Sequence, residues 1–570
     1  MFPFGTDGFA SVLNEIPGKT ASAHVGIGIC PSWPPDLFAV VASIIERSGC
    51  YTLASPDRTA LQAHAAYLDG ITRIAKKWNR DVLRPPNELV KAWTELIGLH
   101  GRTGIGDVSD DRAAVHCLLK LFAIADEASV GMGWDVSQDE AAEHVFASIV
   151  LLNLPQAHPA SGLMPYLPNS LCINVPPDTA IVLPKSITPS VGCTVRSLSH
   201  HLALLPAKSV IASSWTLSSI QPSREPSGDA GLPYDIRLLL LPFPFRIPAD
   251  SFLLSSPRLD FARGNPIPAY FTIAQRWLAS EAGEIDGGRL AEELLLPLIR
   301  QAAKETGRVP HGVVLPECAL SSPTVHTLVE ALVDSGIEFL ISGVLDVDPL
   351  TGKVHNRAKT FIIRPSENGV AFLEQNKHHR WRLDRQQTTR YALDFDPDKS
   401  NGKWWEDIDI GQRKLPFFAL RKDMSATTLI CEDLARTDPV MTAIRSVGPN
   451  LVVALLMDGP QLAARWPGRY ATVLAEDPGS AVLTLTNAAM VDRANWLETT
   501  PARSIGLWRD ADGTTQEIGL PPGSLAIALT LQSDSKQQNT LDHRSDHTGS
   551  RQLSFRTMVP LFLAKPPAWL

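Results

Sequence analysis

Short apolar runs alternate with segments of helical periodicity across the second half of this chain of 570 residues. The runs have the length of buried strands and lie at 236–241, 312–315, 338–342, 358–363, 370–374, 426–430, 451–456 and 481–486. Helical patterns occur between them at 268–281, 289–306, 323–335 and 461–477. The alternation predicts an α/β (α+β) fold, because helices that separate strands can cover the faces of a sheet.

The first half predicts a separate, mainly helical domain. Its apolar residues recur at intervals of three or four at 36–48, 57–78, 86–99, 110–128 and 137–153. Because a single core rarely exceeds about 250–300 residues, we expect two domains. We assign 1–215 to a helical accessory domain with a proline-rich connector, 216–233 to a Ser/Pro/Gly-rich linker and 234–570 to the second domain.

The C-terminal part of the second domain carries two further predictions. Residues 504–508 and 524–531 are expected to form strands, with a turn at 510–513 between them. Residues 533–552 are polar, and we expect them to be mobile.

Composition argues against several classes of protein. No apolar run reaches the roughly 18 residues that a membrane span needs, and the N-terminus lacks a signal-peptide pattern. The net charge of −8 makes nucleic acid an unexpected partner, so the basic run at 73–84 is interpreted as a solvated helix face. Seven scattered cysteines without a CxxC pair predict neither a disulfide framework nor a zinc site. These features favour a cytoplasmic protein.

Three polar residues stand directly after predicted buried strands: Glu317, Lys377 and Cys431. The end of a strand delivers a side chain into a pocket with little positional freedom. A carboxylate can take the proton of a thiol, and an ammonium group can stabilise the oxyanion that forms when the sulfur attacks a carbonyl. Together the three residues therefore predict a cysteine-dependent acyl-transfer site.

The segments around these residues resemble the carbon–nitrogen hydrolase (nitrilase/amidase) superfamily, whose catalytic set is Glu–Lys–Cys in this chain order. The resemblance lies in VVLPE (313–317), HNRAKTFIIRPSENGVAFLEQNKHH (355–379), LICEDLAR (429–436) and GRYATVLAEDPGSAVLTLTNAA (468–489). It covers roughly 234–532, and the N-terminal half resembles no family that we recognise.

The resemblance implies an α-β-β-α four-layer sandwich that forms a homodimer or a higher oligomer. It also implies that Glu317 is the general base, Lys377 the oxyanion stabiliser and Cys431 the nucleophile, with the backbone N–H of Glu432 in the oxyanion hole. Many members carry a second glutamate about eight residues after the lysine. Arg385 stands at that spacing here, so Asp384 is the candidate substitute. His378 is a candidate for tuning Lys377 or binding an anionic substrate.

These observations predict hydrolysis of a non-peptide C–N bond in a small molecule, an amide or a nitrile, through an acyl-enzyme on Cys431. Neither a metal nor an organic cofactor is expected. Two alternatives stay open: a regulatory or scaffold protein whose second half is a binding module, and an acyltransferase. Residues 1–215 are a candidate surface for a protein partner.

Overall fold

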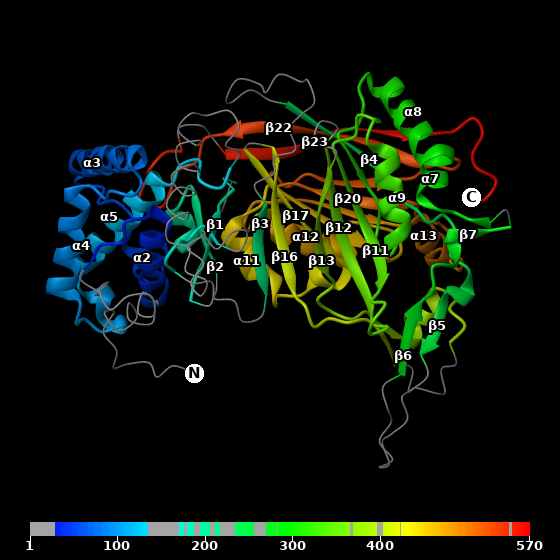
Figure 1. Ribbon diagram of the computed structural model, residues 1–570, viewed down its shortest axis with the longest axis horizontal. Coiled ribbons are helices and arrows are strands. Elements are labelled where there is room, and N and C mark those ends of the chain that lie inside the picture. The colour runs from blue at the N-terminus through cyan, green and yellow to red at the C-terminus, as the bar shows by residue number, and fades with distance from the viewer. Residues whose placement is uncertain are drawn as a thin grey trace, which may run out of the picture.

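The α/β composition expected from the sequence is confirmed, with helices in the N-terminal part of the chain and sheets in the C-terminal part (Figure 1). The computed structural model describes residues 29–134, 170–175, 179–186, 188, 194–205, 211–216, 234–255, 269–281, 283–364, 369–395, 403–421, 423–546 and 550–570. Among the helices in these ranges, none is both long enough and apolar enough to cross a bilayer.

Four α-helices build the described part of the N-terminal region, close to the predicted positions. They are α2 (Pro34–Ser48), α3 (Leu61–Arg80), α4 (Asn87–His100) and α5 (Arg112–Ala128). Sequence-local signals explain their ends: Gly49 closes α2 with a φ of 71°, and the Asp111 side chain caps α5 by accepting the amides of Ala113 and Ala114. The apolar faces form one core with Trp33, Trp78 and Trp93. The helix expected at 137–153 lies outside the described residues.

The first large sheet has the strand order β13-β12-β11-β9-β4-β22-β23, and β10 pairs with β11. Its strands are β4 (Tyr234–Leu240), β9 (Gly312–Val314), β10 (Leu320–Ser321), β11 (Phe339–Val347), β12 (Val354–Arg364), β13 (Gly369–Asn376), β22 (Ala526–Lys536) and β23 (Ser550–Leu561). One face is covered by α7 (Gly287–Leu290), α8 (Leu296–Thr306) and α9 (Ser322–Leu332), with a π-helical turn, Ala291–Leu295, between the first two.

The second large sheet has the order β21-β20-β19-β18-β17-β16-β3. Its strands are β3 (Ala212–Thr216), β16 (Lys414–Arg421), β17 (Met424–Ile430), β18 (Leu451–Leu456), β19 (Ala481–Thr486), β20 (Ser504–Arg509) and β21 (Thr515–Gly519). The three parallel strands β17 to β19 are buried along their whole length, as continuous apolar runs predict. Helices α11 (Val440–Val447) and α12 (Trp466–Glu476) pack on the outer face.

The two sheets face each other across a shared core. Strand β4 shows why: Ile236, Leu238 and Leu240 point into the layer between the sheets. Leu239, on the opposite face, packs under the helices. The described elements therefore stack as helices, sheet, sheet and helices, and the strands of both sheets run side by side in Figure 1.

The helix predicted at 268–281 is wrong. This stretch forms β6 (Ala269–Ile273), the 3₁₀ turn Arg276–Leu278 and β7 (Ala279–Ser280), which pairs with β8 (Gly283–Glu284). Strand β6 pairs with β5 (Phe252–Ser255) and β15 (Lys403–Glu406), and β14 (Arg382–Asp384) completes this small sheet. Tertiary pairing with β15, more than 120 residues later in the chain, overrides the local helical pattern.

Two predictions at the C-terminal end are also corrected. Strand β20 pairs with β21, whereas β22 joins the other large sheet. The segment expected to be mobile at 533–552 contains the end of β22 and the start of β23. Between them, residues 537–546 reach the N-terminal helices (Figure 1), where Nε2 of His64 on α3 lies 2.8 Å from the carbonyl oxygen of Asp542. Arg544 is buried there, so polar composition did not mean exposure.

A two-stranded sheet lies between the helical region and the large sheets. Its strands are β1 (Ile181–Pro184) and β2 (Leu202–Leu205). Ile181 and Leu183 pack into the core beneath α11, whereas Val182 and Leu202 pack against the N-terminal helices. Both sides of this small sheet are therefore buried.

Candidate active site

Glu317 lies in a tight turn that follows β9. Only 2% of its side chain is exposed. The amide of Gly343 donates to the carbonyl of Pro316 at 3.1 Å, and a Cβ atom at position 343 would lie 2.4 Å from the Cα of Glu317. A glycine is required for β11 to approach the turn this closely. The following residue, Cys318, has a φ of 56°, so the backbone on both sides constrains the direction of Glu317.

Lys377 follows β13 and places its ammonium group between two buried carboxylates. Its Nζ donates to Oε1 of Glu317 at 2.8 Å and to Oε2 of Glu406 at 2.6 Å. Only 1% of the lysine side chain is exposed. Burial by itself would lower the pKa of Lys377, but the charges of Glu317 and Glu406 outweigh it and hold this pKa well above its usual value. The ammonium group is therefore charged at neutral pH.

The Glu317 carboxylate uses one oxygen for structure and leaves the other free. Oε1 accepts from Lys377 and from Nδ2 of Asn356 on β12, both at 2.8 Å. Oε2 has no hydrogen-bond partner among the described residues. Burial raises the pKa of Glu317, Lys377 opposes this shift, and the charge of Glu406 adds to it. A fixed carboxylate with an unused oxygen and a raised pKa is suited to accept and return a proton.

The second carboxylate beside Lys377 belongs to Glu406, which sequence reasoning missed. Besides Lys377, Glu406 accepts Nδ2 of Asn356 at 2.9 Å and the amide of Trp381 at 3.0 Å. Period-two alternation in KWWE puts Trp404 and Glu406 on one face of β15, and both are buried. That short pattern is the signal that could have identified Glu406.

Asp384, the expected substitute for the second glutamate, lies at the N-cap of α10 (Arg385–Arg390). Its Oδ1 accepts the amide of Gln387 at 2.8 Å, and the Gln387 side chain reaches back to the amide of Asp384. This reciprocal pair is a capping box. The Asp384 carboxylate is therefore engaged with its own helix, whereas Glu406 is bonded to Lys377.

Cys431 is the first residue after β17 and has a positive φ of 46°. This conformation costs a non-glycine residue about 1–3 kcal/mol, so the surrounding structure must hold it. The 3₁₀ turn Cys431–Ala435 starts here, and the side chain lies at the end of the core between the sheets. Burial raises the pKa of the Cys431 thiol well above its usual value; the charge of Glu317 adds to this shift and that of Lys377 opposes it. The thiol is therefore neutral at rest and within electrostatic range of both groups.

Asp433 ties the turn after Cys431 to the chain that follows Lys377. Its buried carboxylate accepts the amide of His378 at 3.1 Å, and Nδ1 of His379 lies 2.9 Å from Oδ1. The His378 ring is buried, with Nε2 2.9 Å from the carbonyl oxygen of Lys414, and burial lowers its pKa. The side chain of His378 is thus packed against β16, and Asp433 fixes its backbone.

Glu432 points its side chain away from this network. The carboxylate accepts from Arg436 at 2.9 Å, and 23% of the side chain is exposed. The role expected for Glu432 uses its backbone N–H, and that role stays a prediction.

A further buried carboxylate, Asp458, lies just after β18. It accepts the Tyr391 hydroxyl at 2.5 Å, Nη2 of Arg465 at 3.0 Å and Nε1 of Trp466 at 3.1 Å. The charge of Asp458 also raises the pKa of Cys431. The ends of β17 and β18 therefore share one electrostatic environment.

Glu317, Cys318 and Glu406 offer ligand atoms within 4.8 Å of one another, a spacing that a metal ion could use. The Lys377 ammonium group, however, is bonded to both carboxylates at 2.8 and 2.6 Å. It already supplies the positive charge that a cation would bring to this position.

No family model matches the chain, and no curated protein does. Similar solved structures include Saccharomyces cerevisiae Nit3, a member of branch 10 of the nitrilase superfamily, which is 15% identical over 50% of this chain and 86% of its own, with a TM-score of 0.30. A glutamine-dependent NAD(+) synthetase from Cytophaga hutchinsonii is 13% identical over 50% of this chain and 41% of its own, with a TM-score of 0.25. The C. elegans NitFhit protein is 13% identical over 51% of this chain and 62% of its own, with a TM-score of 0.31.

This chain thus spans less than two thirds of the synthetase and of NitFhit. At such identities and TM-scores, function has to be derived from the side chains of this chain itself.

Proposed function

We propose that this protein hydrolyses a non-peptide C–N bond, in an amide or a nitrile, through an acyl-enzyme on Cys431. One observation carries the proposal. The Glu317 carboxylate is fixed through Oε1 by Lys377 and Asn356, has Oε2 unused, and lies in electrostatic range of a thiol at the end of a strand of the facing sheet. A base, a cation and a nucleophile are the three groups that this chemistry needs.

In the first step, the Cys431 thiol loses its proton to Glu317 while its sulfur attacks the carbonyl carbon of the substrate. Because burial raises the pKa of Cys431, a stable thiolate does not wait in the resting site. Oε2 of Glu317 takes the thiol proton as the sulfur bonds to the carbonyl carbon. The carbonyl π electrons move to oxygen, and the Lys377 ammonium stabilises the resulting oxyanion.

In the second step the tetrahedral intermediate collapses. The C–N bond breaks, the leaving amine takes the proton held by Glu317, and a thioester remains on Cys431. Water then attacks the thioester while Glu317 accepts a proton from it. The carboxylic acid leaves, and the sulfur recovers a proton from Glu317. A nitrile would pass through a thioimidate instead and consume a second water.

Glu406 sets the charge of the site. Two carboxylates and one ammonium group give Glu317, Glu406 and Lys377 a net charge of −1. Uptake of the thiol proton neutralises this cluster, and the negative charge passes through the attacking sulfur to the oxyanion beside the Lys377 ammonium group. Glu406 also keeps Lys377 in place when Glu317 is protonated. The second carboxylate expected for this chemistry is therefore available, although from a different element.

The proposal also covers the fold of the second domain, the oligomeric state, the cellular location and a partner. Two facing sheets with helices on their outer faces support a nitrilase-like α-β-β-α sandwich for residues 234–570. We include in the proposal the homo-oligomeric state, the cytoplasmic location and the use of residues 1–215 as a binding region for a protein partner.

The test is to trap the acyl group. The full chain is mixed with p-nitrophenyl acetate and, separately, with acetamide, propionamide and propionitrile, and is then quenched in acid and digested. We expect a burst of nitrophenolate and an added acetyl mass on the peptide of Cys431, with the peptide of buried Cys318 unmodified as an internal control. An equal burst from Cys431→Ala, or no adduct on Cys431 with any probe, contradicts the proposal and favours a binding module.

Hydroxylamine separates hydrolysis from acyl transfer. If water is the natural acceptor, product forms at the same rate without an added amine, and hydroxylamine only diverts part of it to the hydroxamate. A requirement for an amine acceptor would identify an acyltransferase.

A further inference from the structure

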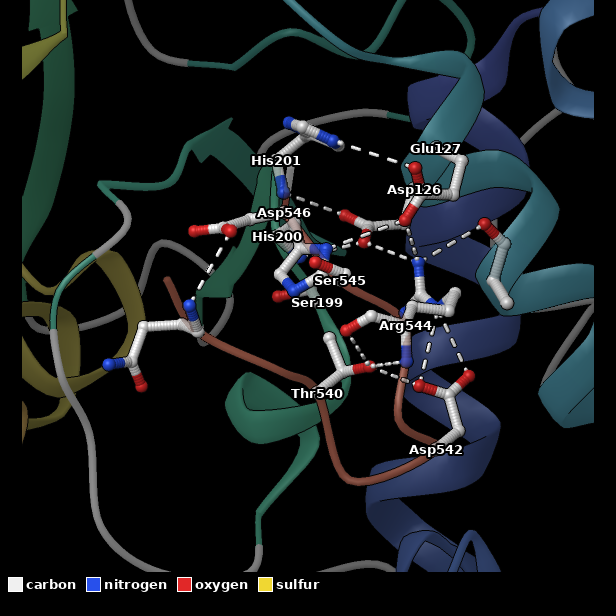
Figure 2. A network of polar contacts seen from close by, with 12 residues as sticks. Asp126, Glu127, Ser199, His200, His201, Thr540, Asp542, Arg544, Ser545 and Asp546 are labelled. Carbon is white, nitrogen blue, oxygen red and sulfur yellow. Dashed lines mark hydrogen bonds and ion pairs between the residues drawn. The ribbon is translucent and has the colours of Figure 1, made fainter. Parts of the chain in front are cut away.

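A second buried polar cluster joins the N-terminal helices to the rest of the chain (Figure 2). It contains Asp126 and Glu127 from the end of α5, His200 and His201 from the turn before β2, and Arg544 from the segment between β22 and β23. The proposed hydrolysis uses none of these residues.

The backbone of the histidine pair is held firmly. The Asp126 carboxylate accepts the amides of His200 at 2.7 Å, His201 at 3.0 Å and Leu202 at 3.2 Å. Three N–H donors on one carboxylate fix the direction of both rings relative to α5. Because Glu127 is the next residue of α5, its carboxylate lies beside the two rings, as Figure 2 shows.

The two rings meet the Glu127 carboxylate at distances that suit a shared metal ion. Nδ1 of His200 lies 3.4 Å from Oε1, and Nε2 of His201 lies 3.8 Å from Oε2. The three ligand atoms lie within 4.8 Å of one another. Ligands bound at about 2.0–2.1 Å in a tetrahedral zinc site are about 3.3–3.4 Å apart. Because the widest separation allowed here is 4.8 Å, side-chain movements of about 1.4 Å or less would complete this geometry.

His200 itself lacks an ordinary hydrogen-bond partner. Only 4% of its side chain is exposed, and neither ring nitrogen makes a hydrogen bond to any residue that the structure describes. A buried imidazole whose nitrogens make no hydrogen bond is costly. A metal ion bound to Nδ1, on the side that faces Glu127, would satisfy one of the two nitrogens. The other two side chains, His201 and Glu127, are 15% and 20% exposed, which leaves a path for an ion and a water ligand.

The charge of the cluster and the hydrogen bonds to its carboxylates also favour a cation. Asp126, Glu127 and Asp542 bring three carboxylates, whereas Arg544 and the neighbouring Lys185 bring at most two positive charges. Nη1 of Arg544 donates to Oε1 of Glu127 at 2.7 Å and to Oδ2 of Asp126 at 3.0 Å. Hydrogen bonds of this kind orient carboxylates that bind a metal. Unlike Glu406, whose two oxygens both accept hydrogen bonds, Glu127 keeps its second oxygen, Oε2, for a metal ion.

We propose that Glu127, His200 and His201 form a binding site for a divalent transition metal ion, zinc by its donor set, that staples α5 to the turn before β2. Two imidazoles and one carboxylate are a zinc ligand set that leaves the fourth position to water. The expectation that the chain holds no zinc rested on the cysteine spacing, which does not bear on a histidine and carboxylate site.

The test titrates Co²⁺ into the full chain, purified without a histidine tag and stripped with chelator. We expect one equivalent of Co²⁺ to bind with visible d–d absorption. His200→Ala and Glu127→Gln should each weaken binding by at least ~100-fold, since even the loss of a residue that only hydrogen-bonds to a metal ligand costs about 10- to 100-fold. His100→Ala is the matched control, because it removes another histidine of the helical region that is bonded to a carboxylate, and it should bind like the wild type. No uptake by the wild type, or unchanged uptake in both site variants, overturns the proposal.

A measurement on the unmodified protein covers the case in which the site variants do not fold. X-ray absorption at the zinc edge of the loaded wild-type chain should show a shell of imidazole nitrogen and oxygen. Sulfur in that shell would place the metal at cysteines instead and overturn the assignment.

Discussion

The networks around Lys377 and Arg544 are alike in that each surrounds one buried cation with carboxylates. They differ in which polar atoms are left without a hydrogen bond. Around Lys377 the unused atoms include Oε2 of Glu317 and Oδ1 of Asn356, both acceptors. Around Arg544, Asp126 is saturated by three amides and the guanidinium, and the unused atoms are the ring nitrogens of His200. An unsatisfied carboxylate oxygen can take a proton, and an unsatisfied imidazole can take a metal ion. The unpaired atom, more than the charge, thus distinguishes a reactive cluster from a structural one.

The largest effect is expected at the reactive cluster. Cys431→Ala removes the sulfur that we propose forms the covalent bond, so turnover should fall on the order of 10⁴-fold or more. The free energy of unfolding should change by no more than about 1–2 kcal/mol, because only one buried sulfur is lost. Steady-state kinetics and urea denaturation measure the two quantities. A variant that loses stability and activity together would mean that Cys431 only packs.

Arg544→Met should lower stability and leave turnover nearly unchanged, the opposite of the result expected for Cys431→Ala. It leaves Asp126, Glu127 and Asp542 buried without their guanidinium partner, which should cost about 3–5 kcal/mol of unfolding free energy. Turnover per folded molecule should stay near the wild-type value. Arg556→Met is the control, since Arg556 pairs with Asp235 at the surface and is 53% exposed. That pair should contribute at most about 1 kcal/mol. Equal losses of unfolding free energy from Arg544→Met and Arg556→Met would show that the buried network around Arg544 is no more important for stability than a surface ion pair.

Asp36 is a second buried carboxylate of the helical region, and its pKa can be compared with that of Asp126. Like Asp126 it is buried and accepts amide N–H groups, here those of Ile173 and Asn174. Arg544 lowers the pKa of Asp126 against the effect of burial, whereas burial raises the pKa of Asp36 from 3.8 to about 6.

The folded state therefore favours protonated Asp36. Its contribution to stability is complete below pH 3.8 and is lost as the pH rises to about 6, by about 3 kcal/mol. Asp36→Asn should remove this slope from urea unfolding measured between pH 4 and 7. Asp57→Asn, at an exposed aspartate of the same region, should leave the slope intact. A wild type whose stability rises through this range because of Asp36 would contradict the expectation.

The smallest effect is expected from Glu406→Gln. The amide keeps the shape of the side chain but removes one of the two charges that hold Lys377, so kcat should fall about 100-fold through misplacement of the ammonium group. Glu374→Gln, on the strand that leads to Lys377, is the matched control and should leave kcat unchanged. If both variants behave alike, Glu406 does not position Lys377.

Much of this architecture could be predicted from the chain because it depends on local pattern. Four N-terminal helices and the strands before Glu317, Lys377 and Cys431 lie within a few residues of their expected positions. Apolar runs of strand length mark buried strands, and a polar residue directly after such a run marks the end of the strand. The order Glu317, Lys377, Cys431 along the chain suggested the type of reaction, because it resembles the order in the carbon–nitrogen hydrolases.

The errors come from residues whose partners are distant in sequence. The stretch 268–281 carries a helical pattern, but pairing with β5 and β15 makes most of it strand. Residues 537–546 look like solvated chain by composition, yet Arg544 finds Asp126, 418 residues earlier. Glu406 stands 29 residues after Lys377 rather than about eight, on a strand too short to attract notice.

The amino-acid sequence by itself determined the helices, the buried strands and which polar side chains leave the strands at their ends, because helical and strand periodicities are local. Only the tertiary structure decided which carboxylate faces Lys377, which ones enclose Arg544 and which buried atoms stay unpaired. Coulomb attraction and the cost of desolvation depend on distance and burial in space, and neither can be counted along the chain.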